Sequence, residues 1–105
     1  MKRPRRRVRI AESFFEQLDG LLPADRGPNG EPSATDFLVI DLPSIVDLFA
    51  AGFDALPEVI EGVPSARMLI GVGRLVARFV VFGLEAPDGS IDLIGLDLDT
   101  LDLDT

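Results

Sequence analysis

The chain has no cysteine, histidine, tryptophan or tyrosine, and Lys2 is its only lysine. Without cysteine it forms no disulfide and offers no thiolate. Without histidine it holds no Ser–His, Cys–His or histidine–metal site of its own. Any catalysis therefore depends on carboxylates, arginines, hydroxyls or backbone N–H groups. The absence of cysteine fits the cytoplasmic location that we expect.

Long apolar runs are also absent. No run approaches the ~20 residues that span a bilayer, and no apolar signal core follows the basic start, so we expect no membrane partner and no signal peptide. Hydrophobic residues still make up 47% of the 105 positions, which excludes general disorder. We expect residues 7–99 to form one domain. Residues 1–6 then form a flexible basic arm, and residues 100–105 an acidic tail or an extension of the last strand.

Positive charge is scarce outside the start of the chain. The net charge is −8, from 18 carboxylates and 10 basic residues. The arm supplies our candidate nucleic-acid-binding residues, because a basic segment attracts a phosphate backbone. These are Lys2, Arg3, Arg5, Arg6, Arg7 and Arg9. Three alternatives stay open: the arm docks on its own acidic body, it contacts an acidic partner protein, or it is a solubilising tail.

Alternating apolar residues predict a first strand at 7–11 and three later strands at 67–71, 75–85 and 91–98. The strand at 75–85 is apolar on both faces in its middle, which predicts a central place in the sheet. Tight turns join the last three strands. They should therefore pair as an antiparallel meander at the end of the chain.

Apolar residues at helical spacing predict helices at 13–22 and 44–56. Ser13 is the expected N-cap of the first helix, and Glu16 completes a capping box. The expected fold class is therefore α+β, with an antiparallel sheet that ends in a three-stranded meander and two helices packed on one face.

Two stretches between these helices are harder to assign. Residues 23–33 are rich in proline and glycine and predict a loop. Residues 36–42 fit either a short strand or a helix opened by a capping box at Ser33 and Asp36. We favour an extended segment, because the residue before Pro43 is pushed away from helical dihedral angles.

The chain ends in Leu-Asp-Leu-Asp-Thr written twice, at 96–100 and 101–105. The alternation slips between the two copies, so only the first is expected in the sheet. Alternation also places Asp97 and Asp99 on one strand face. A straight strand does not supply the six to eight oxygen ligands that calcium takes from a curved loop. We therefore expect no metal site and no cofactor.

Arg67-Met68-Leu69-Ile70-Gly71 leads through a glycine-containing turn to Arg74 and then to an apolar strand. This motif, and the order of strand, helix, second helix and three strands, resembles the RelE/ParE superfamily of bacterial toxins. The resemblance implies an antitoxin as partner, and ribosome-bound mRNA or gyrase as target. Arg67 and Arg74 fall where arginines of that family lie. With Arg78 they are the candidate catalytic residues, since three guanidiniums on adjacent strands can hold a phosphate. Each can instead pair with a carboxylate across the sheet.

Two functions from different classes follow. The first is a RelE/ParE-like toxin or a degenerate relative that acts by binding, because no histidine is present to move a proton and any ribonuclease activity would be weak. The second is a non-enzymatic protein-interaction module that uses the basic arm or a sheet edge. Both leave a homodimer open.

Overall fold

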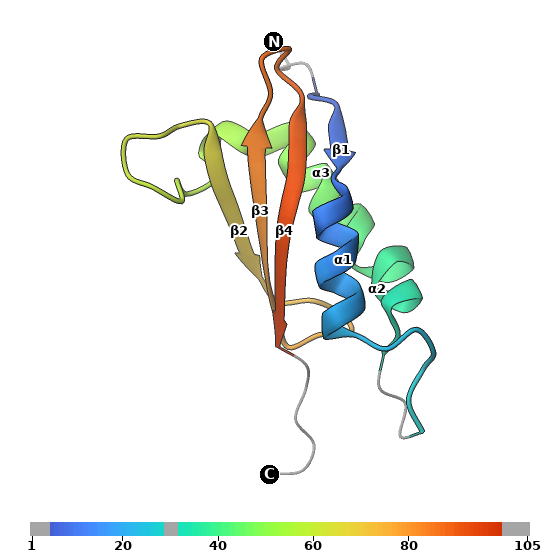
Figure 1. Cartoon of the computed structure of the whole chain (residues 1–105). Helices are drawn as coiled ribbons and strands as arrows, with labels where there is room; N and C mark the ends of the chain where they lie inside the picture. Colours follow the sequence, from blue (N-terminus) through green and yellow to red (C-terminus); the bar gives the residue numbers. More distant parts are fainter. Residues whose placement is uncertain (1–4, 29–31, 100–105) are drawn as a thin grey trace.

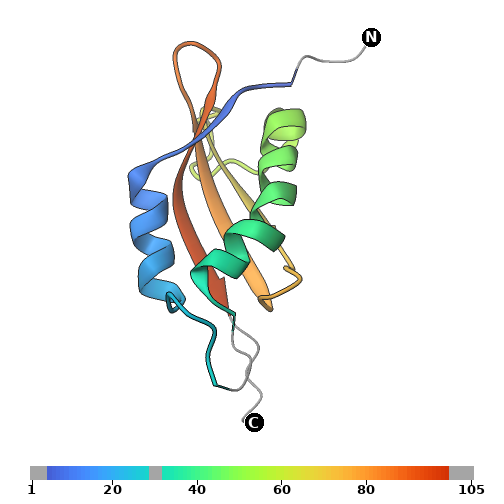
Figure 2. The same cartoon turned by 90° about the vertical axis from the view of Figure 1, so that its right-hand side faces the viewer.

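The computed structural model describes residues 5–28 and 32–99. In this part of the chain one four-stranded sheet carries its helices on one face (Figures 1 and 2). The elements, in chain order, are β1 (Val8–Ile10), α1 (Glu12–Leu21), α2 (Ala34–Ile40), α3 (Leu42–Gly52), the 3-10 turn η1 (Phe53–Ala55), β2 (Ala66–Gly71), β3 (Arg78–Glu85) and β4 (Ile91–Asp99). The α+β class is confirmed. None of the helices described is long and apolar enough to cross a membrane.

The sheet is mixed, which corrects the prediction of an antiparallel sheet ending in a three-stranded meander. Its strand order is β1-β4-β3-β2. The β2–β3 and β3–β4 pairs are antiparallel, but β1 runs parallel to β4. The helices carry the chain from β1 at one edge to β2 at the other. A crossover of that length permits a parallel pair, which a tight turn does not.

A register shift in β4 changes which residues face the core. Ile91 and Leu93 are fully buried. Leu96 and Leu98 after the shift are also buried, although they are even-numbered and the first two are odd-numbered. Opposite Phe82 and Gly83 of β3, the pairing jumps by one residue of β4. One extra residue at such a bulge moves the following side chains to the other face. The bulge therefore keeps the apolar side chains of both halves of β4 in the core. The sequence predicted a break in the alternation only after residue 100.

A helix, α2, occupies the segment for which we favoured an extended conformation. The Ser33 hydroxyl accepts a hydrogen bond from the Asp36 N–H at 3.1 Å, and the Asp36 carboxylate accepts one from the Ser33 N–H at 3.1 Å. This is the capping box that the sequence offered as the alternative. Pro43 does not oppose it, because it lies in the first turn of α3, where its missing N–H has no helical partner to lose.

Arg26 joins this cap from the preceding loop. Its guanidinium donates to both oxygens of Asp36, at 2.9 and 3.0 Å. Hydrogen bonds from Arg26 and from the Ser33 N–H hold the pKa of Asp36 well below its usual range. The stability that this carboxylate contributes is therefore present above the ordinary pKa of aspartate. It is lost as the pH falls through the lowered value.

The bounds of other elements also differ from the prediction. Helix α1 begins at Glu12 with Ala11 as N-cap and no side-chain cap, so Ser13 does not form the expected capping box. The predicted helix at 44–56 is α3 followed by η1. Strand β3 begins at Arg78, and residues 72–77 form the connection from β2. Sequence spacing locates such elements but leaves their ends uncertain by a few residues.

The core lies between the helices and the covered face of the sheet. Its largest fully buried side chains come from both layers: Phe14, Leu18, Phe37, Ile45, Phe49, Val76, Val81, Ile91 and Leu93. Phe49 lies directly on β3, where a Cβ built on Gly83 would come within 2.6 Å of its ring. A side chain at position 83 would displace this ring, so the packing of α3 on the sheet requires glycine there.

Candidate functional site

Two arginines of the predicted arm are held by the chain's own carboxylates. Arg5 forms an ion pair with Asp47 of α3 at 2.6 Å. Arg6 pairs with Asp54 of η1 at 3.0 Å and also with Glu85 at the end of β3. These contacts support the alternative in which the arm docks on its own acidic body.

Of the other predicted nucleic-acid-binding residues that the structure describes, one is paired with a described carboxylate and one is not. Arg9 in β1 pairs with Asp92 of β4 at 2.8 Å, and this hydrogen bond raises the pKa of Arg9. Arg7 is exposed, and its side chain contacts no partner among the residues that the structure describes. Lys2 and Arg3 lie outside the described ranges. A phosphate backbone would therefore have to displace existing ion pairs at three of the four described arginines.

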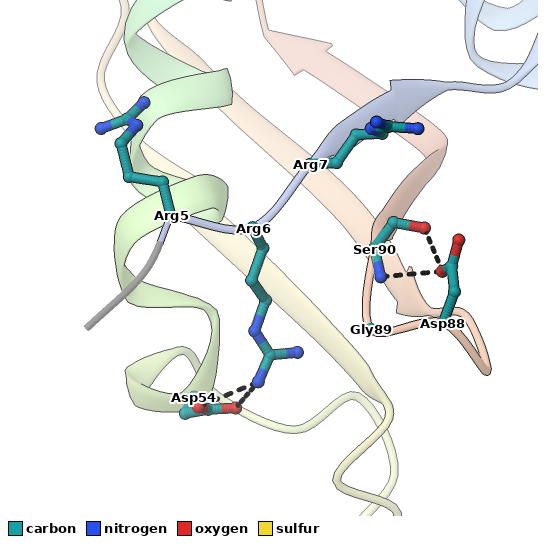
Figure 3. A pocket seen from close by; sticks show the side chains of 7 residues that line it. All are labelled: Arg5, Arg6, Arg7, Asp54, Asp88, Gly89 and Ser90. Carbon is teal, nitrogen blue, oxygen red and sulfur yellow. Dashed lines mark hydrogen bonds and ion pairs between the residues drawn. The ribbon is translucent and has the colours of Figure 1, made fainter.

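An open hollow of about 570 Å³ lies where the start of the chain crosses the β3–β4 turn. It is lined by Arg5, Arg6, Arg7, Asp54, Asp88, Gly89 and Ser90. The three guanidinium groups point in different directions, and the hydroxyl and N–H of Ser90 are bonded to Asp88 (Figure 3). Because the arginines do not converge and two carboxylates share the lining, the hollow is a poor anion site.

Arg67 of β2 forms hydrogen bonds with the loop between η1 and β2. Its guanidinium donates to the carbonyl oxygens of Leu56 at 2.7 Å and of Pro64 at 2.9 Å. It also lies 5.6 Å from the centre of the Phe53 ring and 4.0 Å from a Glu58 oxygen. Only 15% of the side chain is exposed. The hydrogen bonds to Leu56 and Pro64 take up N–H donors that Arg67 would otherwise offer to a phosphate.

The three arginines suggested by the toxin resemblance do not form one site. Arg67 pairs in register with Gly83, whereas Arg78 lies five positions away at the other end of β3. At about 3.3 Å per residue, this places their backbones roughly 16 Å apart. Arg78 pairs with Asp99 at 3.1 Å. Arg74 is exposed in the β2–β3 connection, and its guanidinium has no partner in the described ranges. Nor do those ranges hold a group of carboxylates placed to bind a metal ion.

The outer side of β4 is covered from residue 91 to residue 96. Strand β1 pairs with residues 91–93, and α1 continues the closure where β1 ends. The Ser13 hydroxyl donates to the Ile94 carbonyl at 2.7 Å, and the Gln17 amide oxygen accepts from the Leu96 N–H at 2.7 Å. Two side chains of a helix thus replace a neighbouring strand. Covering an edge in this way prevents pairing with other chains.

The opposite edge, at β2, is closed over only part of its length (Figure 1). The Val59 N–H bonds to the Ala66 carbonyl at 2.9 Å, and the Met68 N–H bonds to the Pro57 carbonyl at 3.0 Å. The even-numbered residues of β2 therefore direct their backbone N–H and C=O groups away from β3. Ile70 is also even-numbered, and beyond Met68 the described chain supplies no further partner strand. The Met68 carbonyl and both backbone groups of Ile70 therefore face the open edge.

This open edge also lacks the usual protection against pairing. Residues 68–73 contain no charged residue and no proline. Ile70 is 53% exposed and Val72 is 82% exposed. Folded proteins normally shield such an edge with charge, proline or a covering element. An uncharged, apolar and unpaired edge is instead typical of a surface that binds another strand.

Apolar residues continue from this edge across the uncovered face of the sheet. On β3 these residues are Val80 and Phe82, which alternate with the residues of that strand that face the core. In the pairing with β2, Met68 lies opposite Phe82 and Ile70 lies opposite Val80. Leu84 extends the row and is 38% exposed. We call the edge at 68–73 and these side chains the β2 surface. Contiguous exposed apolar surface on a folded protein is typical of an interaction site.

Compared with protein-family models, curated proteins and solved structures, the chain shows no significant match to any of them. The β2 surface is therefore assigned from its geometry. Sequence reasoning named a sheet edge without locating it. The available signal was the charge-free run at 68–73, which the sequence divides between a predicted strand at 67–71 and a glycine-containing turn. Choosing between an inner strand and an edge required the strand order.

Proposed function

We propose that the chain is a protein-interaction module that receives an extended segment of a partner protein at the β2 surface. The observation that carries this proposal is the contrast between the two edges. At one edge the sheet ends in the three-residue strand β1 and in α1 side chains that cover β4, whereas the other edge leaves backbone donors and acceptors beside exposed Ile70 and Val72. An added strand would gain main-chain hydrogen bonds from β2. The apolar side chains beside them would supply specificity.

The charge of the molecule supports a protein rather than a nucleic acid as partner. The chain carries a net charge of −8, and Arg5, Arg6 and Arg9 are paired internally. Binding to a phosphate backbone depends on free cationic groups that release counterions. The described arginines offer few such groups.

A proline at position 70 tests this proposal. The Ile70 N–H faces outward, so Ile70→Pro removes a donor to the partner without removing a β2–β3 hydrogen bond. A photo-crosslinking residue at position 72, which is 82% exposed, should capture a partner in cells of the source organism. We expect Ile70→Pro to reduce this capture at least about tenfold, as the loss of a central interface contact does.

The matched control is Val39→Lys, which changes an exposed apolar residue on α2, away from the β2 surface. It should leave capture unchanged. Ile70→Lys, which keeps the backbone donor, separates side-chain effects from backbone effects. Equal capture by the Ile70→Pro variant, with its circular dichroism spectrum intact, would contradict the proposal.

A RelE/ParE-like toxin is the second candidate, and the order of the elements favours it. A strand, a helical segment and three consecutive strands follow one another as the resemblance implies. The proposed toxin acts by binding a translation or gyrase target and is held by an antitoxin. Induced expression in bacteria should then slow growth, and Arg74→Ala should relieve this because Arg74 is exposed. Full growth with folded, wild-type protein present would count against this candidate.

A further inference from the structure

Charge is distributed unevenly around the β2 surface. Residues 66–84 contain three arginines and no carboxylate, so this stretch carries +3. Since the whole chain carries −8, the remaining residues carry −11. The stretch includes all of β2, the connection to β3 and nearly all of β3. The stretch of sequence that forms the open edge therefore carries positive charge in a molecule that is acidic as a whole.

Arg74 is the arginine of this stretch that is available to a partner. Arg67 is held by the loop carbonyls of Leu56 and Pro64, and Arg78 is paired with Asp99. Arg74 is exposed directly after the open edge, and within residues 5–28 and 32–99 its guanidinium has no partner. A carboxylate on an added strand would find this guanidinium at the end of β2.

Strand β4 shows how a strand of alternating leucine and aspartate pairs with a strand of this sheet. In the last part of β4, Leu96 and Leu98 are buried toward the helices, with 4% and 9% of their surface exposed. The alternate residue Asp99 lies opposite Arg78 of β3 and forms an ion pair with it at 3.1 Å. Leucine enters the apolar layer while aspartate pairs with arginine at the strand end.

We propose that the partner segment is an extended strand in which apolar and acidic residues alternate, with a carboxylate beside Arg74. This inference rests on the proposed function and specifies the chemistry of its partner. A basic segment would meet the exposed Arg74 guanidinium and is disfavoured. Carboxylates farther away than about 8 Å are largely screened at physiological salt.

The test is a titration of the full ¹⁵N-labelled chain, followed by NMR at 0.15 M salt, with three capped hexapeptides that share one pattern. They are acetyl-(Leu-Asp)₃-amide, acetyl-(Leu-Asn)₃-amide and acetyl-(Leu-Lys)₃-amide. We expect the aspartate peptide to shift the amide signals of residues 68–73. We expect the asparagine peptide to bind roughly fivefold more weakly, the effect of one exposed ion pair, and the lysine peptide weakest of all.

Two charge reversals provide the matched comparison. Arg74→Glu should remove the preference for the aspartate peptide. Arg7→Glu makes the same change of net charge at an exposed arginine with no described partner and should leave the preference intact. Because both positions are exposed, both variants should fold. Equal loss of preference in the two variants would overturn the inference.

The remaining outcomes separate the inference from the proposed function. If the three peptides bind equally and Ile70→Pro abolishes binding, the edge is a docking site but the acidic partner is wrong. If no peptide shifts residues 68–73, the inference fails, and failure of capture at position 72 would refute the proposed function as well. If light scattering shows a dimer that Ile70→Pro dissolves, a second copy occupies the edge, which also overturns the acidic partner.

Discussion

Replacing Asp41 with alanine is expected to lower the free energy of unfolding by about 2–4 kcal/mol, because two backbone donors lose a charged acceptor. Asp41 lies between α2 and α3, and only 5% of its surface is exposed. Its carboxylate accepts from the Arg74 N–H at 2.7 Å and from the Leu75 N–H at 3.1 Å. Asp41 therefore joins the helical layer to the β2–β3 connection.

Chemical denaturation with urea measures this change. Asp47→Ala is the control, because Asp47 is an exposed carboxylate on the next helix with one ion pair to Arg5. Its removal should cost less than about 1 kcal/mol. Asp41→Asn should lie between the two, since an amide keeps one acceptor oxygen but loses the charge. An Asp41→Ala protein as stable as Asp47→Ala would show that the β2–β3 connection does not depend on this carboxylate.

Replacing Arg67 with alanine should lower the free energy of unfolding by about 2–3 kcal/mol. The Leu56 and Pro64 carbonyl oxygens lose a charged donor, and Phe53 loses one of its two cation–π contacts and keeps the one with Arg6. The loop between η1 and β2 is then less firmly held. Hydrogen exchange should accelerate at the Met68 N–H, which bonds to that loop.

The control for this prediction is Arg78→Ala, which removes an exposed arginine and one exposed ion pair to Asp99. We expect that variant to lose less than about 1 kcal/mol. The comparison bears directly on the toxin candidate. Growth restored by Arg67→Ala can reflect an unstable protein, whereas growth restored by Arg74→Ala cannot be explained in that way. An Arg67→Ala protein as stable as the Arg78→Ala protein would contradict the structural role of Arg67.

Helix α2 shows where local signals competed. The capping box at Ser33 and Asp36 and the restriction before Pro43 pointed in opposite directions within ten residues. The structure follows the capping box, and Pro43 is accommodated in the first turn of α3 after α2 has ended. A rule about the single residue before a proline does not reveal that one short helix ends and another begins within two residues. Asp41, which lies between these two helices and bonds to the β2–β3 connection, is 33 residues along the sequence from its hydrogen-bond partner Arg74.

The sequence alone determined the α+β class, the existence of the four strands and two of the three helices, and the absence of histidine and cysteine chemistry. These follow from composition and from periodicity, which act over a few neighbouring residues. The parallel direction of β1, the bulge in β4 and the pairing of Arg5, Arg6 and Arg9 depended on contacts between distant segments. The open edge was decided in the same way. A strand becomes an edge only when the strand order leaves one of its sides without a neighbour, and no residue of β2 encodes that by itself.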